Sequence, residues 1–109
     1  MLKFKISGER FAEAANTLEY LAIINKSRET ALRLIPRFLL NDDGEYIVKV
    51  VLDEDGDVKD RENEKEALIR LAVLTPKRLG KLADELMEAA QNIVNPPNGG
   101  DSNKPTSTG

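Results

Sequence analysis

The chain begins with a stretch in which apolar and polar residues alternate. Leu2, Phe4 and Ile6 fall on one face, and Lys3, Lys5 and Ser7 fall on the other. Because successive side chains of a strand point to opposite faces, this period of two predicts a half-exposed β-strand over residues 1–7. Ser7-Gly8 ends the pattern, and the Ser7 hydroxyl can cap a following helix.

Two segments with helical periodicity follow this strand. A single apolar stripe predicts a helix over residues 9–24. After a short break at residues 25–26, Ser27 is a good N-cap for a second helix. Because Pro36 lies inside the pattern of that helix and removes a backbone hydrogen bond, we expect the helix to end or kink near Ile35.

The middle of the chain predicts a strand between two acidic turns. Residues 45–52 are rich in β-branched residues and apolar on both faces, so we expect a strand covered on two sides. Asn-Asp-Asp-Gly at residues 41–44 and Asp-Glu-Asp-Gly-Asp at residues 53–57 are turn signals. Residues 58–60 are consistent with the start of a hairpin return.

Two more helices and a tail complete the pattern. Residues 61–74 predict a helix that is charged in its first half and apolar in its second. Thr75-Pro76 supplies a cap and then proline at the first helical position, and the cleanest apolar stripe of the chain follows as far as residue 94. Gly80 lies within this helix at a cost of about 1 kcal/mol relative to Ala, for which a close helix crossing is one reason. Residues 95–109, rich in Pro, Gly, Ser, Thr and Asn, predict a disordered tail.

These elements predict an α+β fold in a single small domain over residues 1–94. In order, we expect an N-terminal strand, two helices, a central strand or hairpin, and two C-terminal amphipathic helices. Two arrangements remain open for the first strand. It pairs with residues 45–52 of the same chain in one small sheet, or it pairs only with a second chain.

Composition narrows the chemistry that the chain can perform. The 109 residues include no Cys and no His. The chain therefore has no disulfide framework, no thiolate metal site and no Ser-His or Cys-His nucleophile. Carboxylate or lysine catalysis stays possible in principle, but no catalytic constellation is visible, so we expect neither an enzyme nor a cofactor. Without a signal peptide or a long apolar run, we expect a cytoplasmic protein that does not contact a membrane.

Charge is distributed unevenly along the chain. Residues 1–40 carry seven Lys and Arg against four Glu, whereas residues 41–109 carry nine basic and fifteen acidic residues. A basic front and an acidic rear suggest two surfaces with different partners, although chance also accounts for such a difference. Lys77, Arg78 and Lys81 form a small basic cluster that we expect to be a solvated face balanced by Asp84, Glu85 and Glu88.

The acidic turn at residues 53–57 invites a metal interpretation, because carboxylate oxygens are ligands for Ca²⁺ and Mg²⁺. The spacing does not match an EF-hand loop, since Gly56 precedes Asp57 and no suitably placed Glu ends the loop. We therefore interpret this segment as a hairpin turn and expect no metal site.

The first forty residues resemble a ribbon–helix–helix DNA-binding unit. Lys3-Phe4-Lys5-Ile6-Ser7 looks like the ribbon, and Asn25-Lys26-Ser27-Arg28-Glu29-Thr30-Ala31-Leu32-Arg33 looks like the loop and the start of the second helix. The resemblance implies a homodimer whose paired ribbon enters the major groove of duplex DNA. Lys3, Lys5 and Ser7 would then face base edges, and Ser27 and Arg28 would bind phosphate. The alternative is that Lys3 and Lys5 are the solvent face of an edge strand.

Two functions therefore remain as expectations. The first is a small dimeric DNA-binding transcriptional regulator, with an acidic module over residues 41–94 that binds a protein partner. The second is a non-catalytic protein-interaction or assembly module with no nucleic-acid role, in which the first strand pairs within the chain. The pairing partner of residues 2–7 is the observation that best separates them.

Overall fold

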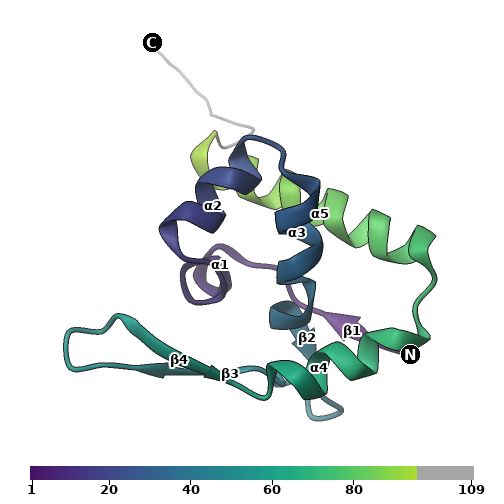
Figure 1. Ribbon diagram of the computed structural model, residues 1–109, viewed down its shortest axis with the longest axis horizontal. Coiled ribbons are helices and arrows are strands. Elements are labelled where there is room, and N and C mark those ends of the chain that lie inside the picture. The colour runs from purple at the N-terminus through teal and green to yellow at the C-terminus, as the bar shows by residue number, and fades with distance from the viewer. Residues whose placement is uncertain (96–109) are drawn as a thin grey trace.

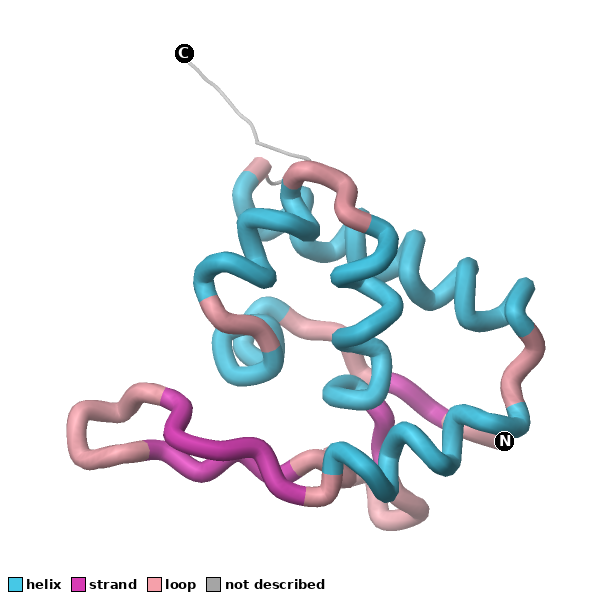
Figure 2. The backbone as a smooth tube through the Cα atoms, viewed as in Figure 1, coloured by secondary structure: helices cyan, strands magenta, loops and turns pink. Residues whose placement is uncertain are grey.

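The computed structural model describes residues 1–95. Within these residues, five α-helices accompany two antiparallel sheets of two strands each, which confirms the α+β class (Figures 1 and 2). The predicted tail lies almost wholly outside the described residues. No described helix has both the length and the apolar composition needed to cross a membrane.

The N-terminal strand pairs within its own chain. β1 (Lys3–Phe4) lies antiparallel to β2 (Leu39–Leu40), with Lys3 opposite Leu40 and Phe4 opposite Leu39. The Lys5 N–H extends the pairing by donating to the Phe38 carbonyl at 3.0 Å. Sequence periodicity did not reveal β2, because a strand of two residues is too short to establish a period.

The prediction that the first strand pairs with residues 45–52 of the same chain is wrong, because its partner is β2. Tyr46 lies on the other side of β2, where it forms a single antiparallel bridge with Leu40. The Ile47 N–H donates to the Leu39 carbonyl at 3.1 Å. β2 therefore lies between β1 and residues 46–47, and β1 is left at the edge of this small sheet.

The single helix expected over residues 9–24 is two helices, α1 (Gly8–Ala14) and α2 (Thr17–Ile24). Asn16 forms a capping box with Glu19: the Asn16 side chain accepts from the Glu19 N–H at 2.8 Å, and the Glu19 carboxylate accepts from the Asn16 N–H at 2.9 Å. Because this reciprocal cap satisfies the amides that begin a new helix, the chain breaks where the apolar stripe alone predicts continuity.

The predicted Ser27 cap and the break at Pro36 are both confirmed. Ser27 Oγ accepts from the Thr30 N–H at the start of α3 (Arg28–Leu34). The α-helix then gives way to a 3₁₀ turn, η1 (Ile35–Phe38), with proline near its start. This tighter turn leads the backbone directly into β2.

The predicted hairpin is present, but it is not covered on two sides. β3 (Lys49–Leu52) pairs with β4 (Val58–Glu62), and the hairpin extends away from the helices (Figure 1). Burial stops at Val48, while Lys49 and Leu52 are exposed. Although β3 has apolar side chains on both faces, neither face is fully buried, because the strand extends beyond the hydrophobic core.

The last two helices are α4 (Glu64–Arg70), continued by the 3₁₀ turn η2 (Leu71–Val73), and α5 (Pro76–Val94). The expected start of α4 at residue 61 is too early, because β4 extends to residue 62. The Thr75 cap is confirmed, with its hydroxyl accepting from the Arg78 N–H at 3.1 Å.

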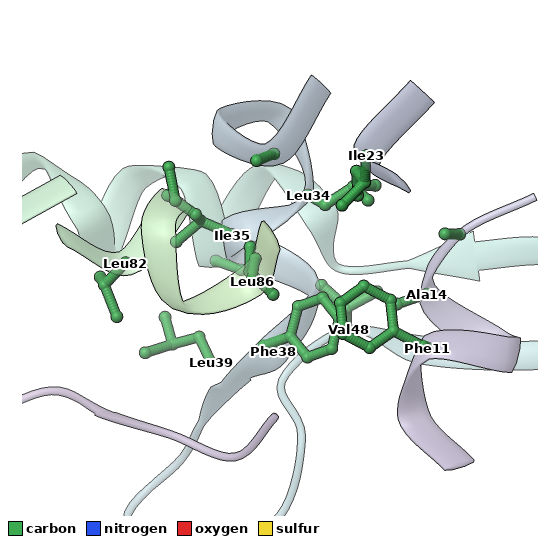
Figure 3. Close-up of a cluster of buried hydrophobic side chains, with 14 of the residues drawn as sticks. Phe11, Ala14, Ile23, Leu34, Ile35, Phe38, Leu39, Val48, Leu82 and Leu86 are labelled. Carbon is green, nitrogen blue, oxygen red and sulfur yellow. The ribbon is translucent and has the colours of Figure 1, made fainter. Parts of the chain in front are cut away.

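One hydrophobic core joins the front and rear parts of the chain (Figure 3). The rings of Phe11 and Phe38 lie 4.9 Å apart between centroids, and Leu82 and Leu86 from α5 are buried in the same cluster. Residues 1–40 and 41–94 are therefore not separate modules. α5 packs against α2 and α3 and supplies one wall of a groove that it forms with β1.

Candidate functional site

The buried charged groups hold the fold together. The Arg10 guanidinium donates to the Arg37 carbonyl at 2.8 Å and to the Val48 carbonyl at 2.7 Å, and it lies 3.9 Å from the centroid of the Tyr46 ring. Burial lowers the pKa of Arg10, and the Glu13 carboxylate partly offsets this effect. Because its hydrogen bonds go to buried backbone carbonyls, we assign Arg10 a structural role in the fold.

Arg37 and Arg61 continue the same network. Arg37 donates to the Ala14 carbonyl at 2.6 Å and to the carboxylates of Glu64 at 2.7 Å and Glu19 at 3.2 Å. Arg61 donates from the base of the hairpin to the Glu13 carbonyl at 2.9 Å. Burial, and then the nearby charge of Arg37, lower the pKa of Arg61. These arginines join α1, η1, the hairpin and α4.

The acidic turn at residues 53–57 is organised by the Asp53 side chain, which binds backbone N–H groups of the turn. Asp53 Oδ1 accepts from the Asp55 and Asp57 N–H groups, both at 2.9 Å, and Gly56 adopts the left-handed φ of +85° that the turn requires. Among the described residues, no group of three or more candidate ligand side chains is placed to hold a metal ion.

A groove of about 590 Å³ lies between β1 and α5. Its wall on one side is the N-terminal strand region, and its wall on the other is a single face of α5. Because residues three and four apart share a helix face, Arg78, Leu82 and Glu85 point toward it together. The lining residues are Leu2, Lys3, Phe4, Lys5, Ile6, Leu40, Arg78, Leu82 and Glu85.

The strand that borders the groove has an open edge. In an antiparallel pair, backbone groups of alternate residues point toward the partner. The Lys5 N–H bonds to the Phe38 carbonyl, so the backbone groups of Lys3 and Lys5 face β2 and those of Phe4 face the other edge. The described part of the chain places no further strand against that edge. A second extended segment can therefore pair there.

The groove combines an apolar floor with a mostly cationic rim. Leu2, Phe4 and Leu82 supply apolar surface, while Lys3 and Lys5 are exposed and share the groove with Arg78. The guanidinium of Arg78 lies 3.8 Å from the Glu85 carboxylate, which offsets part of its charge. The cations of α5 lie in its first turns, where the helix dipole opposes them and favours an external anion.

The sequence analysis identified Lys3 and Lys5 as candidate binding residues, but it did not predict that they share a groove with Arg78. The sequence signal that could have pointed to Arg78 was the basic cluster at residues 77–81. Cations at the start of a helix are disfavoured by the helix dipole, so this cluster was a candidate site for an anionic ligand. The expected balance by Asp84 is wrong, because Asp84 forms an ion pair with Arg28. More than seventy residues separate the two cationic segments, so only the tertiary fold brings Lys3 and Lys5 to one groove with Arg78.

The other predicted nucleic-acid contacts lie apart from this groove. Ser7 Oγ caps α1 by accepting from the Arg10 N–H at 3.2 Å, and Ser27 caps α3. Arg28 forms an ion pair with Asp84 and donates to the Gly80 carbonyl at 3.1 Å. At 100° per residue, Gly80 lies on the opposite side of α5 from Arg78. The five predicted residues therefore do not form one surface.

A second exposed surface is apolar. Leu68, Ile69 and Val73 on α4 and η2 are 60%, 64% and 77% exposed. Ile69 and Val73 are four residues apart and lie on one side of the helix, and Leu68 lies about 100° around the axis from Ile69. Clustered apolar side chains of this kind are typical of protein contact surfaces.

Comparisons with known protein families, with curated proteins and with solved structures returned no match for this chain.

Proposed function

We propose that this chain is a non-catalytic protein-interaction module that binds an extended acidic segment of a protein partner in the groove between β1 and α5. The observation that carries the proposal is the open edge of β1, which borders an apolar groove with Lys3, Lys5 and Arg78 on its rim. Main-chain hydrogen bonds to a strand edge supply affinity, and the side chains beside it supply specificity.

The DNA-binding alternative has less support in the geometry. The expected ribbon pairs the first strand only with its copy in another molecule, whereas β1 pairs with β2 of its own chain. Ser7, Ser27 and Arg28 are engaged in helix caps or in an ion pair.

The apolar face of α4 and η2 supports a protein partner as well. A nucleic-acid surface is dominated by Lys and Arg that neutralise phosphates, whereas this face exposes Leu68, Ile69 and Val73. With no Cys in the chain, the cytoplasm remains the location that we expect for this module.

The proposal is tested with a labelled peptide of alternating Glu and Val and a control peptide of alternating Lys and Val. We expect fluorescence anisotropy to show binding of the acidic peptide only. The double variant Lys3→Glu/Lys5→Glu should weaken that binding at least about tenfold, which corresponds to about 1.4 kcal/mol. It should also gain affinity for the basic peptide, because the rim charge is reversed.

A matched control carries the same charge change elsewhere. Lys26→Glu/Lys65→Glu alters two exposed lysines outside the groove and should leave acidic-peptide binding within about twofold of wild type. Binding of duplex DNA that is lost in Lys3→Glu/Lys5→Glu, with no binding of the acidic peptide, would favour the DNA-binding alternative. Equal binding of both peptides would contradict the proposal.

A further inference from the structure

The hairpin of β3 and β4 is an acidic element that projects from the molecule. Its turn, residues 53–57, carries four carboxylates and no cation. The base is fixed to α1 through Arg61, whereas the turn extends away from the helices (Figure 1). An isolated two-stranded hairpin is marginally stable in water, so additional pairing along its edge would stabilise it.

The outer edges of the two hairpin strands differ in character. In the described part of the chain, β3 and β4 pair only with each other in their sheet. β4 is protected by charge, since Lys59, Asp60, Arg61 and Glu62 follow Val58. β3 has one charged residue, Lys49, and ends at the exposed Leu52. Because charged side chains discourage edge pairing, β3 is the more receptive edge.

The hairpin matches the groove both in its open strand edge and in its charge, which is opposite to that of the groove rim. It is an extended segment with an open strand edge and a run of carboxylates at its tip, and the groove offers an open strand edge with Lys3, Lys5 and Arg78. Opposite charges placed in this way attract each other and fix the register of a contact.

One copy cannot make this contact with itself. The hairpin turn lies at one side of the molecule, and β1 lies on the other side, along an axis with an extent of 48 Å (Figures 1 and 2). The hairpin turn and the groove are therefore two separate surfaces of the molecule. A contact between them therefore joins two copies of the chain.

We propose that the ligand of the groove is the β3–β4 hairpin of a second copy of this chain. This inference rests on the proposed function, because it uses the same groove and names its occupant. The outer edge of β3 adds to the outer edge of β1, and the carboxylates of the turn lie against Lys3, Lys5 and Arg78. Made reciprocally, this contact gives a two-fold dimer, and repeated head to tail it gives a chain or a closed ring.

Sedimentation velocity over a concentration series tests the proposal with full-length protein. We expect the weight-average sedimentation coefficient to rise with concentration at low salt and to return toward the monomer value as salt is added. Lys3→Glu/Lys5→Glu should raise the dissociation constant of self-association at least about tenfold. Glu54→Lys/Asp55→Lys should do the same, since it removes the net negative charge of the turn and keeps the Asp53 bonds that form it.

Combining the two pairs of substitutions in one chain supplies the decisive measurement. The quadruple variant has Glu at two groove positions and Lys at two turn positions, so it should associate at least about threefold more tightly than Lys3→Glu/Lys5→Glu, in which the groove carboxylates face the unchanged acidic turn. Lys26→Glu/Lys65→Glu is the matched control and should associate as wild type does. Far-UV circular dichroism of each variant establishes that loss of association is not loss of folding.

The outcomes distinguish this inference from the proposed function. A chain that stays monomeric at all concentrations but binds the acidic peptide overturns the inference and leaves the peptide-binding function intact. A chain that neither self-associates nor binds the peptide overturns both. Self-association unchanged by Lys3→Glu/Lys5→Glu, or no tighter in the quadruple variant than in Lys3→Glu/Lys5→Glu, places the interface elsewhere and overturns the inference.

Discussion

Arg37→Met tests whether one buried guanidinium joins the helices to the rear half of the chain. Arg37 donates to the Ala14 carbonyl, to Glu64 at 2.7 Å and to Glu19 at 3.2 Å. The ion pair with Glu19 is well shielded, with side chains 10% and 15% exposed. Met preserves most of the apolar stem, so the variant mainly removes the charge and its hydrogen bonds.

The expected cost follows from the groups that remain. Removing one partner of a buried ion pair typically costs 3–5 kcal/mol, because the other charge is left uncompensated. Glu64 is partly exposed and can be solvated, so we expect the lower end, about 3 kcal/mol. Against a total stability of about 5–15 kcal/mol, a loss of this size is large.

Urea unfolding followed by circular dichroism measures this cost, with Arg70→Met as the matched control. Arg70 pairs with Glu66, but the side chains are 45% and 56% exposed. An exposed pair of this kind contributes about 0.5 kcal/mol or less. Adding Glu19→Gln to Arg37→Met should recover about 1 kcal/mol, because it removes the orphaned charge. Equal costs for Arg37→Met and Arg70→Met would refute the reasoning.

Three further predictions concern the caps, the helix crossing and pH. Asn16→Ala removes the capping box between α1 and α2 and should cost about 1 kcal/mol in urea unfolding, and an unchanged midpoint would contradict this role. Gly80→Ala should gain about 1 kcal/mol of helix stability in an Arg28→Ala background but less in wild type, because the new Cβ would lie 2.8 Å from Arg28 Nη2. Burial lowers the pKa of Arg10 and Arg61, so their charged forms are disfavoured in the fold and the linked stability rises only at strongly alkaline pH. With no His in the chain, thermal midpoints should therefore stay nearly constant between about pH 6 and about pH 9, and a marked step there would contradict this assignment.

Local signals in the sequence predicted the helix starts well. Ser7, Ser27 and Thr75 each cap the helix that follows them, because a side-chain oxygen satisfies a nearby backbone amide whatever the rest of the fold does. The break between α1 and α2 was missed, although Asn16 and Glu19 have the spacing of a capping box. The apolar stripe continued across that break, and periodicity alone favoured one helix.

The pairing of strands that are distant in the sequence could not be predicted from local signals. β1 and β2 have two residues each, too few to establish an alternating pattern. The strand expected over residues 45–52 was located correctly only in its second half. Its partner is the neighbouring β4, whereas β1 pairs with a distant segment, with Phe4 opposite Leu39, 35 residues further along the chain. A register that links distant segments depends on how the helices between them pack.

The sequence by itself determined the α+β class, the capped helices, the acidic turn and the cationic face of the first strand. Each of these depends on side chains acting on backbone or solvent within a few residues. Only the tertiary structure decided that Lys3 and Lys5 share a groove with Arg78 and that Arg28 faces the other side of α5. The physical reason is that a helix presents its faces at 100° per residue, so the orientation of α5 against the core selects which of its cations meet the strand.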